Sequence, residues 1–325
     1  MIMTQRRNIR LITAVTLAFA AMASSAPTGA AASSYPDRMI RIVVPFSAGS
    51  MTDILARVLS EKLGQMWRQS VIVENRSGIA GAASVANSAP DGYTIMLTSN
   101  GHTVIGKVNS NLTFDPVGDF VGISKIASMP LTLVVPPDSP AKSLADLIVR
   151  AKASPGKMSY ASAGLASTSY IASELLKQTA NIDLFHVPYR GLADAINSVM
   201  RGDTTMLFTP SANGLDLIEA GKVRALAVSA PTRFPGLPAV PTFAEAGLPE
   251  FVYDAWFGML APAGTQREIL EKISRDIHTV LNSPEIKDLL SRQGIVPVTS
   301  SPEDFTSLLK NDTARFSRLL PSLQN

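Results

Sequence analysis

Side chains that could do chemistry are few in this 325-residue chain, and they lie far apart in the sequence. There is no cysteine, and the three histidines, His102, His186 and His278, lack a metal-ligand spacing such as H-E-x-x-H. The G-x-S-x-G turn of many hydrolases and the GxxxxGK[ST] loop for nucleotide phosphates are also missing. We therefore expect no catalytic residue, no metal site and no cofactor, and we expect each histidine to be a surface or packing residue.

Turns rich in glycine and hydroxyl side chains, in contrast, follow several predicted strands. The first joins a strand over 39–46 to a helix over 52–63, which Gly64 is expected to end. Free amides and the dipole at a helix N-terminus favour an anion, and Ser50 or Thr52 can cap this helix. A plain capped turn would have the same sequence pattern. The expected binding residues here are Phe46, Ser47, Ala48, Gly49, Ser50 and Asp53.

Two more turns are expected beside the first, because an open α/β sheet binds ligands at the carboxyl ends of its strands. In the turn at 75–81, Gly78 and Gly81 permit close backbone approach. Arg76 in the same turn is a rival holder of a carboxylate, although a surface arginine is the commoner outcome. The expected binding residues are Gly78, Ala80 and Gly81, with Ser99 and Asn100 after the next strand.

A turn at 160–170 is the best candidate for a carboxylate in the second half of the chain. Its hydroxyls lie beside the N-terminal amides of a predicted helix. The expected binding residues are Ser162, Ala163, Gly164, Ser167 and Thr168, with Tyr189 after the following strand. None of them is cationic, so we expect neutral dipoles at two helix N-termini to hold the carboxylate, with Arg76 and Arg190 as the rival explanation.

The elements that position these turns alternate between strand and helix, which predicts parallel sheets with covered faces. An apolar stretch at 120–135, interrupted by Pro130, and a second at 251–260 break the pattern. Two such crossings predict two α/β lobes with a hinge and an interlobe cleft. Lobe one takes 35–131 plus 253–325 and lobe two takes 132–252. Trp256 at the second crossing either stacks on a planar ligand, as a binding residue, or packs in the core.

The N-terminus has the layout of a secretory signal peptide. Three arginines precede an apolar run at 11–22, and an A-x-A cleavage site follows at 30–32. The run is shorter than the ~20 residues that span a bilayer, which disfavours a membrane anchor. Loss of residues 1–32 removes three arginines and no acid, so the formal charge falls from +3 to 0. A neutral chain offers no electrostatic footprint for nucleic acid or an anionic membrane.

Seven phrases in one order resemble the Bug family, the periplasmic solute receptors of tripartite tricarboxylate transporters. They read YPDRMIRIVVPFSAGSMTDILAR, VIVENRSGIAGAASVANSAPDGYTIMLTSN, LTFDPVGDF, KSLADLIVRAKASPGKMSYASAG, HVPYRG, AGKVRALAVSAPTRFPGLPAVPTFAEAGLP and WFGMLAPAGT. The resemblance implies a type II periplasmic-binding-protein fold, a periplasmic location, and capture of an organic acid, amino acid or aromatic carboxylate. The chain departs from the family pattern in two places. The family usually has two prolines and two glycines where this chain has Ser47, Ala48, Gly49 and Ser50, and many members have histidine where it has Tyr170.

Three functions are compatible with these features. The first is a monomeric receptor that delivers its ligand to membrane transporter subunits. The second is a sensory receptor that presents its closed form to a sensor kinase ectodomain; it would bind in the same way, and gene neighbourhood separates the two. The third is a secreted hydrolase, against which the missing nucleophile–base pair argues and which turnover of esters or amides would revive. We expect a receptor for a small carboxylate and not an enzyme.

Overall fold

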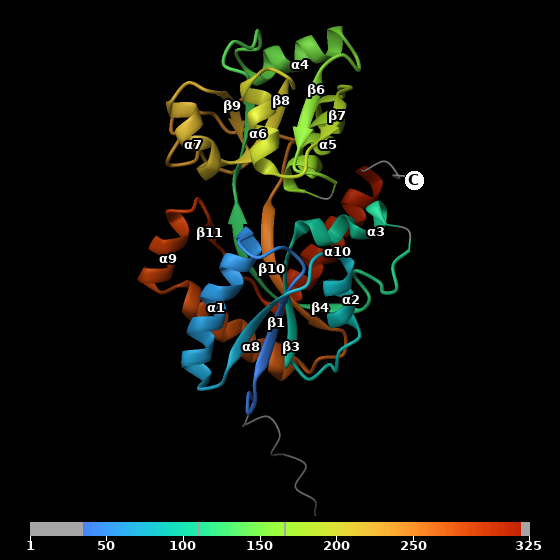
Figure 1. The fold of residues 1–325 in the computed structure, drawn as a ribbon, viewed down its shortest axis with the longest axis vertical. Helices are drawn as coiled ribbons and strands as arrows, with labels where there is room; N and C mark the ends of the chain where they lie inside the picture. Colours follow the sequence, from blue (N-terminus) through green and yellow to red (C-terminus); the bar gives the residue numbers. More distant parts are fainter. Residues whose placement is uncertain (1–34, 110, 166, 320–325) are drawn as a thin grey trace, which may run out of the picture. The chain divides into compact units, whose positions relative to one another are not determined.

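The computed structural model describes residues 35–109, 111–165 and 167–319, which form two mixed sheets flanked by helices (Figure 1). The expected signal peptide, residues 1–32, lies outside these ranges. Among the described residues, no helix combines the length and the apolar character needed to cross a membrane.

The first sheet has six strands within the described ranges, in the order β11-β4-β10-β3-β1-β2. They are β1 (Ile40–Val44), β2 (Val71–Asn75), β3 (Thr94–Ser99), β4 (Phe120–Met129), β10 (Ala255–Pro262) and β11 (Val296–Pro297). β1 is parallel to β2 and β3, as the alternation predicts, but β10 is antiparallel to β3 and β4. The parallel pairing expected for the first three strands is confirmed, and β10, from the second expected crossing, adds an antiparallel strand between β3 and β4. β10 enters directly from the second sheet without a helical crossover, and strands joined in that way can run antiparallel.

The helices that accompany the first sheet are α1 (Met51–Trp67), α2 (Ile79–Ala86), η1 (Asn100–Val104), α3 (Ile105–Val108), α8 (Arg267–Leu281), α9 (Pro284–Ser291) and α10 (Pro302–Leu319). Side chains of α2 and α10 share an apolar core with β1, β3 and β10 that includes Val43, Met96 and Phe305. On α1, Trp67 Nε1 donates to Asp276 Oδ2 of α8 at 2.6 Å. These contacts tie the C-terminal helices to the N-terminal strands and to α1.

Helix α1 does not end at Gly64, which corrects the prediction from the sequence. It continues to Trp67 and ends at Arg68, which adopts the left-handed conformation with φ 54°. Leu63 and Trp67 are both buried, so continuing the helix for another turn places a large aromatic side chain in the core. Burial of this face decides where the helix ends, because a glycine costs a helix only about 1 kcal/mol.

The second sheet has five strands within the described ranges, in the order β7-β6-β8-β5-β9. They are β5 (Leu131–Val135), β6 (Ser159–Ser162), β7 (Phe185–Pro188), β8 (Met206–Pro210) and β9 (Arg224–Val228), and the helices are α4 (Leu144–Ala153), α5 (Thr168–Ala180), α6 (Leu192–Met200) and α7 (Ser211–Glu219). Only Pro130 separates β4 from β5, so the chain passes from one sheet to the other where the apolar stretch was expected to cross. Proline has no N–H for a strand ladder, which favours such a break.

Candidate functional site

The α1 turn, residues 46–50, leads from the carboxyl end of β1 into α1. Ser50 caps the helix with φ −67° and ψ 159°, and its Oγ accepts from the amide of Asp53 at 3.2 Å. This cap satisfies the third amide of the helix and leaves the first two without an acceptor inside the helix. The positive end of the helix dipole lies at the same place. The α1 turn therefore offers an uncharged seat for an anion, and residues 47–49 are exposed.

Asp53 holds the α1 turn in place through hydrogen bonds within the protein. Its carboxylate is 3% exposed and accepts from the Gly49 amide at 2.9 Å, from Asn75 Nδ2 at 2.9 Å and from Arg57 Nε at 3.0 Å. Burial by itself would raise the pKa of Asp53, but the hydrogen bonds from Arg57, Gly49 and Asn75 outweigh it and lower the pKa below its ordinary value. The predicted binding residue Asp53 is thus placed one hydrogen bond behind the turn.

Replacing Asp53 with Asn is expected to lower the free energy of unfolding by about 1–3 kcal/mol near neutral pH, since the Gly49 amide then faces a side chain with fewer acceptors. Because the folded state lowers this pKa, the carboxylate stabilises the protein fully above the unfolded pKa of about 3.9 and loses that effect as pH falls through the lower folded value. The measurement is urea unfolding of both proteins at about pH 7 and about pH 3. This account is contradicted if the two proteins differ in free energy of unfolding by as much at about pH 3 as at about pH 7.

The α5 turn, residues 162–165 and 167–168, repeats this arrangement at the carboxyl end of β6 in the second sheet. Ser167 caps α5 with φ −71° and ψ 156°, and its Oγ accepts from the amide of Tyr170 at 3.2 Å. Gly49 in the first turn and Gly164 in this one have positive φ values, 80° and 103°, which glycine adopts without strain. Each sheet therefore carries a serine-capped helix N-terminus entered through a glycine.

The hydroxyls of the α5 turn are mostly engaged within the turn itself. Ser167 Oγ donates to the Gly164 carbonyl oxygen at 2.6 Å, and the fully buried Ser162 Oγ accepts from the Gly164 amide at 3.1 Å. Thr168 is the first residue of α5 and is half-buried, and no hydrogen bond among the described residues uses its hydroxyl. Ser162 and Ser167 thus shape the turn, whereas the Thr168 hydroxyl takes no part in holding it.

The other predicted residues of the first sheet lie at the same edge as the α1 turn. The Gly78 amide donates to the Pro45 carbonyl oxygen at 3.0 Å. A Cβ on Gly81 would lie 2.1 Å from the Arg76 carbonyl oxygen, so the close approach within the turn at 75–81 requires glycine there. Asn100 is fully buried at the end of β3, and its Nδ2 donates to the Tyr253 hydroxyl at 2.7 Å. Of the remaining predicted residues, Ala80 is exposed, Ser99 is buried, and Phe46, Ala163 and Tyr189 are half-buried.

Trp256 packs in the core, which corrects the prediction that it stacks on a ligand. The side chain is 0% exposed, meets Phe305 edge to face at 5.2 Å between ring centroids, and donates from Nε1 to Asp312 Oδ2 at 2.7 Å. Burial raises the pKa of Asp312 above its ordinary value. Core packing was the alternative reading of the same pattern. Tyr170, where the family pattern often has histidine, is also buried, at 2% exposed.

Neither rival arginine belongs to the α1 turn or to the α5 turn. Arg76 forms an ion pair with Glu74 on the surface, and Arg190 is exposed after β7. Arg57, which contacts the α1 turn through Asp53, is engaged with Asp53 and Asn75. Surface ion pairs of this kind contribute little to the stability of the folded protein. The geometry agrees with seats made of neutral dipoles.

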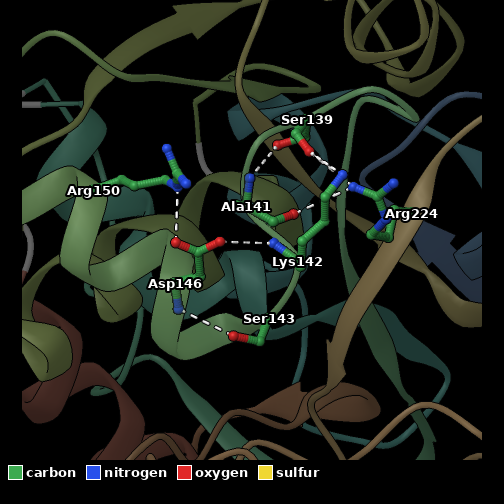
Figure 2. A network of polar contacts seen from close by, with 7 residues as sticks. All are labelled: Ser139, Ala141, Lys142, Ser143, Asp146, Arg150 and Arg224. Atoms are coloured by element: carbon green, nitrogen blue, oxygen red, sulfur yellow. Dashed lines mark hydrogen bonds and ion pairs between the residues drawn. The ribbon is translucent and has the colours of Figure 1, made fainter.

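Cations also line a hollow of about 480 Å³ beside β9, apart from both turns, which includes Lys142 and Arg224. Figure 2 shows how these side chains are engaged. Arg224 Nη1 and Nη2 donate to the carbonyl oxygens of Ser139 at 2.9 Å and Pro137 at 2.6 Å, and Lys142 Nζ donates to Ser139 O at 3.0 Å. These hydrogen bonds to carbonyl oxygens fix the loop before α4, so we assign both side chains a structural role.

A family model described as the tripartite tricarboxylate transporter family receptor matches residues 55–324. The chain belongs to this family. Protein BugT of Bordetella pertussis is 32% identical over 313 residues, which cover 95% of each chain. The UPF0065 protein in the tcbD-tcbE intergenic region of a Pseudomonas species is 37% identical over 304 residues, which cover 92% of this chain and 90% of that protein. The Bug-family resemblance expected from the sequence is confirmed.

Solved structures of the family share the fold. R. palustris Rpa4515 with adipate is 33% identical with a TM-score of 0.74, covering 88% of this chain and 97% of that chain. MatC from Rhodopseudomonas palustris with bound malate is 28% identical with a TM-score of 0.73, covering 88% and 99%. The periplasmic binding protein BugD is 30% identical with a TM-score of 0.72, covering 88% and 97%. The two-lobed periplasmic-binding-protein fold expected from the sequence is confirmed.

One contact in this family member was not predicted from the sequence. Ser162 Oγ lies 2.7 Å from His186 Nε2, although 24 positions separate the residues, because β6 pairs with β7. A nucleophile must reach its substrate, and Ser162 is fully buried. The nearby carboxylate, Glu174, accepts from Tyr160 and Lys177 and does not orient the imidazole. The pair is therefore not arranged as in a hydrolase, and the family and its solved members are solute-binding receptors.

A metal centre is also not indicated. Within the described ranges, no group of three or more His, Cys, Asp or Glu side chains is arranged to hold a metal ion. Burial lowers the pKa of His102 to about 4, and its Nε2 lies 2.8 Å from the Pro116 carbonyl oxygen, as in a packing residue. His278 is exposed on α8.

Proposed function

We propose that this protein is a periplasmic receptor that binds a small carboxylate and delivers it to the membrane subunits of a tripartite tricarboxylate transporter. The observation that carries the proposal is the pair of serine-capped helix N-termini, one at the carboxyl end of β1 and one at the carboxyl end of β6. Helix N-termini bind anions through free amides and the helix dipole. Relatives solved with adipate and with malate support a carboxylate as the ligand class.

In this proposal the chain divides into lobe one, 35–131 plus 253–325, and lobe two, 132–252, with the ligand between them. Each lobe supplies one capped turn. A carboxylate or its bridging waters therefore form the most hydrogen bonds when both turns lie close to the ligand. Residues 1–32 direct export and are removed, which places the mature chain in the periplasm as a monomer. The transporter subunits recognise the closed form.

Closure predicts a change in size that solution scattering can measure. A saturating carboxylate is expected to lower the radius of gyration without forming an oligomer, because the lobes rotate about the two crossings. The protein is first unfolded and refolded, so that a ligand retained from the cell does not keep it closed. An unchanged radius in the presence of a bound carboxylate, shown by calorimetry on the same sample, counts against closure.

The decisive experiment identifies the ligand class directly. Protein purified without dialysis is analysed by native mass spectrometry for a retained small acid, and refolded protein is titrated by calorimetry with adipate, malate and adipamide. We expect a dicarboxylate to bind and adipamide to bind much more weakly, because a neutral acceptor gains less from the dipoles. Equal affinity for adipate and adipamide, or retention of a non-acidic compound, overturns the proposal.

A further inference from the structure

His186 of β7 lies in an aromatic cluster behind the α5 turn. Its ring stacks on Tyr160 with 4.8 Å between centroids and an angle of 16°, and lies 5.0 Å from the ring of Tyr170. Both tyrosines are almost fully buried, whereas the imidazole is half-buried. The ring orientation is therefore set by packing, and water can still exchange protons with the imidazole.

The imidazole is connected to the α5 turn through one hydroxyl. His186 Nε2 lies 2.7 Å from Ser162 Oγ. The same Oγ accepts from the Gly164 amide at 3.1 Å and lies 3.4 Å from the Gly164 carbonyl oxygen. Gly164 has φ 103°, and its carbonyl also accepts from the Ser167 cap at 2.6 Å. A change at His186 thus reaches the Ser167 cap through three consecutive hydrogen bonds, which join His186 to Ser162, Ser162 to Gly164, and Gly164 to Ser167.

We propose that His186 is the positioning residue of the α5 turn, and that its protonation strengthens anion binding there. The inference rests on the proposed function, since it concerns the same seat. It assigns a role to a residue that need not touch the ligand, and it predicts that the affinity depends on pH.

The proton positions follow from the contacts. With a neutral imidazole protonated at Nδ1, the Ser162 hydroxyl donates to Nε2 and its oxygen accepts from the Gly164 amide. When Nε2 takes a proton from solvent, the direction reverses. Nε2–H donates to Ser162 Oγ, and the hydroxyl proton turns to the Gly164 carbonyl oxygen. The Gly164 amide donates to Ser162 Oγ in both states, whereas the second state adds the hydrogen bond to the Gly164 carbonyl oxygen and a positive charge behind the seat.

The charged and titratable neighbours of His186 come from the two elements packed against it. β6 contributes Tyr160, and α5 contributes Tyr170, Glu174 and Lys177. Burial lowers the pKa of His186, Glu174 opposes that effect, and Lys177 adds to it. Glu174 is already bound by the Tyr160 hydroxyl at 2.5 Å and Lys177 Nζ at 3.0 Å, so its charge is largely compensated. His186 is therefore mainly neutral near pH 7 and gains its charge on acidification.

An anion at the N-terminus of α5 interacts favourably with that added charge. Affinity for a carboxylate is expected to rise as pH falls toward the pKa of His186. By linkage, a bound carboxylate raises the pKa of His186 by the matching amount.

Three variants separate positioning from general packing. His186→Phe keeps the stacked ring and loses the hydrogen bond to Ser162. His186→Gln can keep a donor or acceptor near Ser162 and cannot titrate. His278→Gln, on the exposed face of α8, is the matched control for loss of a histidine.

Hydrogen–deuterium exchange of the free protein tests positioning without any ligand. In His186→Phe the amides of 163–170 are expected to exchange about fivefold faster, the loss of one net hydrogen bond, while His186→Gln and His278→Gln stay within about twofold of the unaltered protein. Unchanged exchange in His186→Phe overturns the proposal. So does a uniform increase over the whole chain, which would mean global destabilisation.

Calorimetry with adipate between about pH 6 and pH 8, where both of its carboxyl groups are mostly ionised, tests the charge. The unaltered protein and His278→Gln are expected to bind about threefold more tightly at the lower pH, and His186→Gln is expected to lose this slope. A slope that survives in His186→Gln overturns the proposal. If adipate binds to no variant, the proposed function fails for this acid, and the exchange experiment alone decides whether His186 positions the turn.

Discussion

A protein carrying Gly258→Ala is expected to lose about 3 kcal/mol or more of its free energy of unfolding, at the upper end for overpacking a core. A Cβ at this position of β10 would lie 1.9 Å from Phe305 Cζ and 2.6 Å from two more atoms of the same ring. A methyl group cannot approach a ring so closely. The ring, the strand or helix α10 must therefore shift.

The Phe305 ring has little room to move. It is 0% exposed and meets Trp256 edge to face. It also covers Gly122 of β4, where a Cβ would lie 3.0 Å from Phe305 Cδ1 and 2.7 Å from the Thr306 amide nitrogen. One phenylalanine of α10 thus packs directly on the backbone of two neighbouring strands, and both strands need glycine beneath it.

Urea unfolding measures this loss, and two further variants make it specific. Gly106→Ala is the matched control, because its Cβ would lie 3.8 Å from Leu112 Cδ1, an ordinary contact; a change within about 1 kcal/mol is expected. Phe305→Leu in the Gly258→Ala background should recover part of the loss, since a smaller side chain relieves the overlap. An unchanged midpoint for Gly258→Ala would show that the sheet and α10 adjust freely.

Thr168→Val is expected to weaken carboxylate binding tenfold to a hundredfold. Valine keeps the shape of threonine and removes the hydroxyl of the first residue of α5. A hydrogen bond to a charged group contributes about 1.5–3 kcal/mol, and about 1.4 kcal/mol is a factor of ten in affinity. The effect on a matching primary amide should be much smaller. Calorimetry of the variant with adipate and adipamide checks both statements.

Thr168→Ser is the control, because it restores the hydroxyl and should bind close to the unaltered protein. Arg76→Gln and Arg190→Gln test the rival explanation that arginine holds the carboxylate. Both arginines are exposed, and Arg76 already pairs with Glu74, so we expect less than about a threefold change for each. Loss of binding in either arginine variant, with Thr168→Val unaffected, would falsify the neutral-dipole account.

Local features of the site could be predicted from the sequence because they depend on neighbours a few positions away. Ser50 was named as a possible cap, and it does cap α1; Ser167 was named as a binding residue beside a helix N-terminus and caps α5. Caps form between residues three positions apart, so they depend on the local sequence. The crossing at Pro130 was also predicted, because proline interrupts a strand ladder whatever surrounds it.

Contacts between distant residues were decided only by the tertiary structure. Asp53 was expected to bind ligand, and its contact with Asn75, the last residue of β2, could not be predicted because only the pairing of β1 with β2 brings Asn75 near. Trp256 could have lined a cleft or the core, and Phe305 from the far end of the chain makes it core.

The sequence by itself therefore determined the class of fold, the family and the two capped turns. The tertiary structure decided which polar side chains remain for a ligand. Ser162 and His186 show the difference most clearly, because strand pairing alone brings them to 2.7 Å. Periodicity and caps are properties of neighbouring residues, whereas burial and partnership depend on which strands pair and which helices cover them.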